Sequence, residues 1–232
     1  MNISHICFKK NYDMKVKISI SLLLLLFLSS CLNYTQVTTI KTDGTGNMFI
    51  HYSMKWNNQR DSAMVEQLGI FNKDSVYKEF SSQFSHLNNV NIYKDVDSTI
   101  HTKVELYFNS LDSLNNTPAF RKSQLSVKES EKNTKVFSQF IPPIATGFGY
   151  GNQKFTFTFI YYLPGEILSH NATDINRNRL TWKYSVDEIG MGKYITATYR
   201  PFKLKETPIW IYIIALFVLS VVIVYLFSKR IK

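Results

Sequence analysis

Apolar and polar residues alternate along most of the chain between residues 37 and 199. This period of two is typical of a β-strand that buries one face and exposes the other. The clearest case is the segment 154–163, KFTFTFIYYL, in which phenylalanines alternate with threonines. The alternation predicts that the central part of the chain is built mainly from β-strands.

Short runs of turn-forming residues separate several of the alternating segments. The runs are Asp-Gly-Thr-Gly at 43–46, Asp-Val-Asp-Ser at 95–98 and Glu-Lys-Asn at 131–133. Each run lies between two apolar segments and therefore predicts a β-hairpin. The strands predicted in this way are 37–40, 48–52, 90–93, 100–108, 125–128, 136–141, 154–163, 180–184 and 194–199.

The period changes between the first two hairpins. Apolar residues recur at helical spacing from Val76 to Phe84, after the cap candidates Asp74 and Ser75. A second, shorter helix is predicted at 61–68. This succession predicts an α+β fold, with a curved, mainly antiparallel β-sheet and one or two packed helices.

The last apolar run has a different character. Residues 208–227, PIWIYIIALFVLSVVIVYLF, carry no charge, and a helix of this length would be about 30 Å long, which matches the hydrocarbon core of a bilayer. The basic residues that follow, 228–232, are typical of a cytoplasmic flank. The sequence therefore predicts a single C-terminal transmembrane helix and a short cytoplasmic tail.

The N-terminal residues 1–30 have the layout of an export signal, with lysines followed by the apolar stretch 18–28. The stretch ends in Leu-Ser-Ser-Cys at 28–31, which resembles the lipobox of bacterial lipoproteins. That resemblance implies cleavage before Cys31 and acylation of its thiol. An ordinary signal peptide with an incidental cysteine is the alternative interpretation. Met14 is a plausible true start, because the segment that it begins is already a complete signal.

The two ends also explain the charge. The chain has a formal net charge of +10, of which residues 1–30 and the tail 228–232 carry +3 each. The basic character is therefore mostly that of membrane-topology signals, and no nucleic-acid partner is expected. We expect the protein in the cytoplasmic (inner) membrane, lipid-anchored and single-pass, with the domain 31–205 outside and the C-terminus in the cytoplasm.

A β-rich domain between a lipobox and a terminal apolar helix is similar to the LppM-type family of bacterial lipoproteins. The segment that carries the likeness most closely is 163–188, LPGEILSHNATDINRNRLTWKYSVDE, in which Trp182 is expected in the core. The resemblance implies a membrane-tethered envelope domain with a tendency to bind lipid or glycolipid. It supplies no catalytic residues.

Residues that could support catalysis are scattered. The histidines at 51, 86, 101 and 170 lack the spacing of a metal site, and the chain has no G-x-S-x-G nucleophile motif. Gly-Phe-Gly-Tyr-Gly at 147–151 precedes a strand, whereas a phosphate-binding loop precedes a helix. We therefore expect no enzyme activity, no cofactor and no metal. Phe148 and Tyr150 in this loop are candidates for contact with lipid, or they fold onto the sheet.

These observations favour a non-catalytic module that binds lipid, glycolipid or the membrane surface. The alternative is a scaffold or accessory subunit that docks another envelope protein through a sheet edge or through its C-terminal helix.

Overall fold

The structure is a computed structural model that describes residues 32–55, 66–67, 69–143, 155–202 and 208–229. The chain divides into two compact units, one that ends at Pro201 and one that begins at Phe202. All the strands belong to the first unit.

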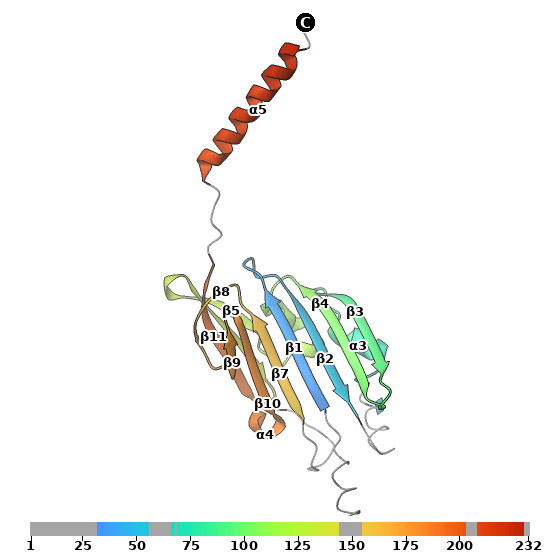
Figure 1. The fold of residues 1–232 in the computed structure, drawn as a ribbon. Coiled ribbons are helices and arrows are strands. Elements are labelled where there is room, and N and C mark those ends of the chain that lie inside the picture. The colour runs from blue at the N-terminus through green and yellow to red at the C-terminus, as the bar shows by residue number, and fades with distance from the viewer. Residues whose placement is uncertain (1–31, 56–65, 68, 144–154, 203–207, 230–232) are drawn as a thin grey trace, which may run out of the picture. The chain divides into compact units, whose positions relative to one another are not determined.

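The larger sheet has seven strands in the order β3-β4-β2-β1-β7-β10-β9 (Figure 1). Neighbouring strands are antiparallel except β1 and β7, which are parallel. The bounds of these strands are β1 (Leu32–Ile40), β2 (Gly46–Met54), β3 (Ser85–Lys94), β4 (Ile100–Phe108), β7 (Thr156–Tyr162), β9 (Asp174–Asn176) and β10 (Arg179–Ser185).

The smaller sheet has four antiparallel strands in the order β5-β6-β11-β8. Its strands are β5 (Ser126–Ser130), β6 (Thr134–Ile141), β8 (Gly165–His170) and β11 (Lys193–Pro201). The chain passes from the larger sheet to the smaller one directly after β7, which ends at Tyr162, and β8 begins at Gly165. A side chain has no room at this position, since a Cβ on Gly165 would lie 2.2 Å from the Arg200 carbonyl oxygen.

The three predicted hairpins are confirmed. Ile40 pairs with Gly46 across the first turn, in which the Asp43 carboxylate accepts hydrogen bonds from the Thr45 backbone N–H and hydroxyl. Because side chains alternate along a strand, this register places the inward-facing residues of β1 opposite those of β2.

The two sheets pack face to face through large aromatic side chains. The ring centroids of Phe137 and Tyr161 lie 4.3 Å apart, and those of Tyr161 and Trp182 lie 6.1 Å apart at an angle of 82°. All three side chains are fully buried. The expectation that Trp182 lies in the core is confirmed.

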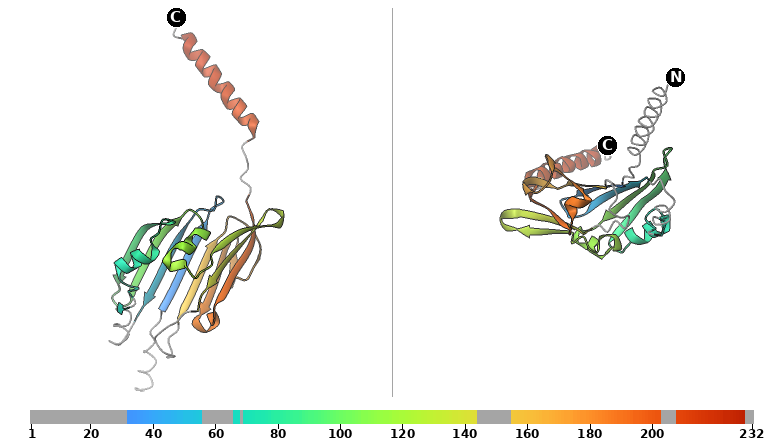
Figure 2. Two further views of the ribbon diagram at one scale, coloured as in Figure 1. Left: turned by 180° about the vertical axis from the view of Figure 1, so that it is seen from behind. Right: turned by 90° about the horizontal axis from the view of Figure 1, so that it is seen from below.

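The rest of the inner face of the larger sheet is covered by short helical segments (Figure 2). These are α3 (Lys73–Phe80) and the 3-10 helices η1 (Asp112–Asn116) and η2 (Pro118–Phe120). The prediction of α3 is confirmed, but its cap is Asn72, whose Oδ1 accepts from the backbone N–H groups of Asp74 and Ser75. The other short elements are α4 (Val186–Ile189) and η3 (Glu131–Asn133).

The predicted fold class is wrong. The structure is mostly β, with two sheets rather than one, and the helices of the first unit are short. The period of two was interpreted correctly, but it does not state which strands pair. The strands after residue 125 therefore divide between two sheets that bury the same aromatic core. The predicted helix at 61–68 lies largely outside the described residues.

The prediction of a transmembrane helix at 208–227 is also wrong. A helix, α5 (Ile209–Lys229), does form there. Among the residues that the structure describes, however, no helix has the length and apolar character needed to cross a membrane.

The indole of Trp182 is held by one amide. Its Nε1–H donates to Asn171 Oδ1 at 2.8 Å, the same oxygen accepts from the Thr196 backbone N–H at 2.9 Å, and Asn171 Nδ2 donates to the Tyr194 carbonyl at 2.8 Å. Asn171 therefore links the two sheets and satisfies a buried donor.

We expect Asn171→Ala to lower the free energy of unfolding by about 1–3 kcal/mol, because it leaves a buried indole N–H without an acceptor. Urea unfolding followed by circular dichroism measures this loss. Asn171→Asp keeps the acceptor for the indole and for Thr196 but loses the Nδ2–H donated to Tyr194, so it is expected to be destabilised as well. A loss below about 0.5 kcal/mol for alanine, the range of an ordinary surface substitution, would contradict this role of the amide.

Candidate functional site

A pocket of about 600 Å³ lies between the inner face of the larger sheet and the helices that cover it. Its volume falls within the usual range for small-molecule sites, about 300–1,000 Å³. Strands β1 and β2 supply one wall, α3 and η2 supply the other, and the segment before α3 contributes to the rim. Its lining includes Leu32, Tyr34, Tyr52, Val76, Phe80 and Ala119.

The walls are apolar because the two tyrosine hydroxyls are already hydrogen-bonded within the protein. Tyr34 donates to Gln36 Oε1 at 3.1 Å, and Tyr52 donates to the Ile70 carbonyl at 2.6 Å. The Tyr34 ring also contacts the rings of Phe157 and Phe159, with centroids 5.9 and 5.7 Å away. The rings are thus fixed in place and present their apolar surfaces to the pocket.

A buried chain of hydrogen bonds extends from Tyr34 into the core. Gln36 Nε2 donates to the Tyr161 hydroxyl at 2.8 Å, and that hydroxyl donates to Gln139 Oε1 at 2.6 Å. Burial raises the pKa of Tyr34 and of Tyr161, and it raises the pKa of Tyr52 to about 12. All three phenols are therefore neutral donors at physiological pH, and they bring no charge to the pocket.

The charged groups of the pocket come from α3. Lys78 and Glu79 both contribute to the lining, and both are exposed to solvent. Their position beside an otherwise apolar pocket suits a ligand with an apolar body and a polar end. Gly69, at φ +67, lies in the rim, where an added Cβ would meet the Ser75 hydroxyl at 2.8 Å.

A second pocket, of about 500 Å³, lies between η1 and the outer face of the smaller sheet. Asp112, Gln124 and Lys128 give it a polar lining, and the Tyr194 hydroxyl donates to Gln124 Oε1 at 2.7 Å. This lining does not suit an apolar chain, which makes the first pocket the better candidate for a lipid.

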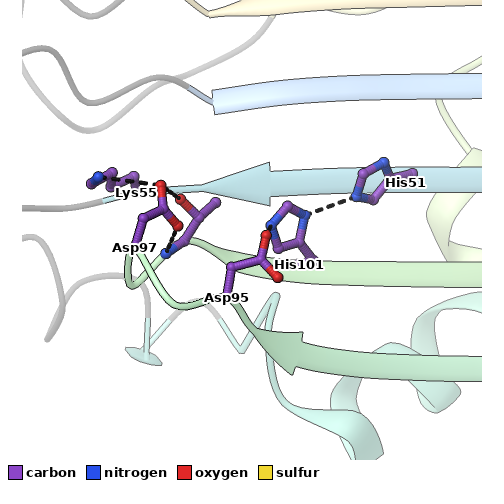
Figure 3. A network of polar contacts seen from close by, with 6 residues as sticks. His51, Lys55, Asp95, Asp97 and His101 are labelled. Atoms are coloured by element: carbon purple, nitrogen blue, oxygen red, sulfur yellow. Dashed lines mark hydrogen bonds and ion pairs between the residues drawn. The ribbon is translucent and has the colours of Figure 1, made fainter.

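Two histidines meet on the outer face of the larger sheet (Figure 3). His51 Nε2 lies 3.0 Å from His101 Nδ1, and His101 Nε2 lies 2.9 Å from Asp95 Oδ2. The Tyr93 ring stacks on His101 at 4.9 Å, and the Lys103 ammonium lies 5.0 Å from the Tyr93 ring centre. A metal site needs at least three ligands, and no such group of His, Cys, Asp or Glu occurs among the described residues.

The contact between His51 and His101 makes the free energy of unfolding depend on pH. Burial, together with the nearby His101 and Lys103, lowers the pKa of His51. The folded chain therefore binds fewer protons than the unfolded chain below the usual histidine pKa of about 6.5. We expect the urea midpoint to fall as the pH decreases from about 6.5 to 5, and His51→Gln to reduce this fall. His86→Gln, at an exposed position on β3, controls for the loss of one imidazole. An equal slope in wild type and His51→Gln would contradict the assignment.

The site residues predicted from the sequence lie outside the part of the chain that the structure describes. These are Cys31, expected to carry lipid, and Phe148 and Tyr150, expected to contact lipid. They stay predictions.

The pocket itself was missed. The first hairpin contained a signal for it, because a turn at 43–46 that pairs Ile40 with Gly46 also pairs Tyr34 with Tyr52 on one face. Nothing in the local pattern shows that α3 and η2 would lie opposite these two rings.

Comparisons with known proteins find likeness among solved structures only. No family model matches the chain. No curated protein matches it either. The structure is similar to the NMR structure of the folded domain of Mycobacterium tuberculosis LppM, with a TM-score of 0.45 and 17% sequence identity, over 74% of this chain and 91% of that domain. At this level the likeness concerns the course of the backbone alone and says nothing about a ligand.

Proposed function

We propose that this protein is an envelope lipoprotein that is anchored through a lipid on Cys31 and binds the apolar chain of a lipid or glycolipid. The binding site is the pocket between β1, β2, α3 and η2. The protein acts as a binding module and not as an enzyme. The observation that carries the proposal is the pocket itself, which is of ligand size and has an aromatic and aliphatic wall.

Three properties of the pocket support an apolar chain as the ligand. Its tyrosine hydroxyls donate to protein acceptors, so the rings offer mainly apolar contacts. The neutral phenols place no charge inside it. Lys78 and Glu79 lie where they could accept the polar end of an amphipathic molecule. The export signal and lipobox-like motif of the sequence support a location at the outer face of a membrane, where such ligands are abundant.

Docking of another envelope protein through a sheet edge is the second candidate, and three of the four described edge strands are poorly suited to it. Strand β9 has only three residues, β3 is interrupted by a bulge between Leu87 and Asn89, and β8 pairs with β11 through a bulge. Short and bulged edges are the usual means of preventing edge-to-edge pairing.

Native mass spectrometry of the full chain, purified gently from the membrane, tests the proposal. The expected result is a one-to-one lipid adduct that disappears on denaturation, in addition to any covalent lipid. After delipidation, the fluorescent fatty acid cis-parinaric acid is expected to bind saturably with one site per chain. A clean apo mass together with non-saturable partition of the probe would overturn the pocket proposal and favour docking of a protein.

A further inference from the structure

The strands of the first unit run between two ends that differ in chemistry. One end carries Ile40, Tyr162 and Arg179, which lie together through the pairing of β1, β7 and β10. The other end carries Leu32, Met54 and Ile100, which lie together through β1, β2 and β4. In Figure 1 the first is the upper end of the sheets and the second is the lower end.

Three hairpin turns at the upper end are polar. They are Lys-Thr-Asp-Gly-Thr at 41–45, Glu-Lys-Asn at 131–133 and Arg-Asn at 177–178. None of these turns contains an apolar side chain. This is the ordinary composition of turns in contact with water.

The lower end carries the two most exposed large apolar side chains of the described first unit, both on turns. The first is Val96, between β3 and β4, whose exposed fraction is 108% of the reference value. Its turn is well ordered by hydrogen bonds. The Asp95 N–H donates to the Thr99 carbonyl at 2.9 Å, and Ser98, at φ +69, donates to the Asp95 carbonyl at 3.0 Å. Val96 is thus held away from the protein by a fixed turn.

The carboxylates beside Val96 are bound to groups of the sheet (Figure 3). Asp97 Oδ2 lies 3.2 Å from Lys55 Nζ, and Asp95 Oδ2 lies 2.9 Å from His101 Nε2. Hydrogen bonds from Thr99 and the nearby Lys55 lower the pKa of Asp97. Each carboxylate therefore has a partner on the sheet, and that of Asp97 is a cation.

The second exposed apolar side chain is Met191, between α4 and β11, with an exposed fraction of 91%. It lies between Gly190, at φ +52, and Gly192, at φ +114, whose N–H groups donate to Val186 and Ile189 carbonyls. An added Cβ on Gly192 would lie 2.3 Å from the Phe140 ring, so this turn packs directly against β6. It is therefore as firmly placed as the first turn.

We propose that the lower end docks on the surface of a lipid bilayer, with Val96 and Met191 inserted among the lipid headgroups. Single exposed apolar residues are common on soluble proteins. Here, however, the two most exposed ones lie on fixed turns at one end, whereas the three hairpin turns at the other end are polar. The inference rests on the proposed function in one respect. Leu32 lies at this same end, and it is the next residue after Cys31, the proposed site of the lipid. The pocket also reaches this end, since Leu32 and Tyr52 line it.

Fluorescence quenching in membranes tests the orientation. The full chain with Cys7→Ser is labelled with an NBD fluorophore at Val96→Cys, Met191→Cys or, as the control at the upper end, Asp43→Cys. Each is placed in vesicles of phosphatidylglycerol and phosphatidylethanolamine that contain a doxyl-labelled phosphatidylcholine. We expect blue-shifted, quenched emission at positions 96 and 191, and unshifted, unquenched emission at position 43. Labelled Cys7→Ser without a new cysteine gives the background from Cys31.

Two outcomes would overturn the inference. One is unquenched emission at both positions 96 and 191, and the other is equal quenching at position 43. The double variant Val96→Asp/Met191→Asp adds a second test, because it is expected to keep the lipid adduct in native mass spectra while quenching of the same fluorophore at Asp187→Cys, on exposed α4 at this end, decreases. Quenched emission at positions 96 and 191 without a lipid adduct would support membrane docking and reject the pocket as a lipid site. A lipid adduct with unquenched emission at these positions would support the pocket and reject membrane docking.

Discussion

Trp182→Ala is expected to lower the free energy of unfolding by about 3–5 kcal/mol, the usual cost of truncating a buried aromatic side chain. The indole is fully buried between the two sheets and contacts the rings of Tyr161 and Phe137. Its removal leaves a cavity in the aromatic cluster that the two sheets share, and it deprives Asn171 of a donor. A loss of this size is a large part of the total stability of an ordinary domain, about 5–15 kcal/mol.

Urea unfolding followed by circular dichroism measures this effect without relying on tryptophan emission. Trp182→Phe is the matched control, since it keeps an aromatic ring in the cavity and removes only the N–H donor and part of the volume. We expect its loss to be well below that of alanine. Equal losses for phenylalanine and alanine would show that the hydrogen bond to Asn171, rather than packing of the ring, holds the sheets together. A loss below about 1 kcal/mol for alanine would contradict both the packing role of the ring and the role of its hydrogen bond.

Ala119→Trp is expected to abolish binding of an apolar chain. Ala119 lies in η2 and lines the pocket opposite β1 and β2, so an indole at this position would occupy the space that the ligand needs. Because the added side chain enters open volume rather than packed core, the free energy of unfolding should change by less than about 1 kcal/mol. The affinity for cis-parinaric acid should fall at least about tenfold, which corresponds to about 1.4 kcal/mol.

The control for this variant is Lys122→Trp, which adds the same side chain at an exposed position just after η2. It should bind the probe as the wild type does. Unchanged affinity in Ala119→Trp, with both variants folded, would mean that the probe binds elsewhere and that the pocket is not the site. Reduced affinity in both variants would point to a non-specific effect of the added indole.

Most of the strands, and the three hairpins, could be predicted from the sequence because the signals for them are local. Strands β8 and β9 were not predicted. The period of two shows which residues share a face, and turn residues such as those at 43–46 determine the register of the first hairpin. The helical spacing of α3 is local in the same sense, although its cap is Asn72 and not Asp74 or Ser75. The apolar run near the C-terminus correctly predicted a helix, but its description as a membrane span was wrong.

The division into two sheets, the parallel pairing of β1 with β7 and the pocket were decided only by the tertiary structure. Residues 34 and 157 are far apart in the chain, and no local pattern states that their rings will touch. The polar Gln36 and Gln139 would each be unfavourable in a core without partners, and the Tyr161 hydroxyl between them hydrogen-bonds to both. The sequence by itself thus determined which faces are apolar. The tertiary structure decided which of those faces close against each other and which leave a pocket, because that choice depends on contacts between segments that local periodicity does not specify.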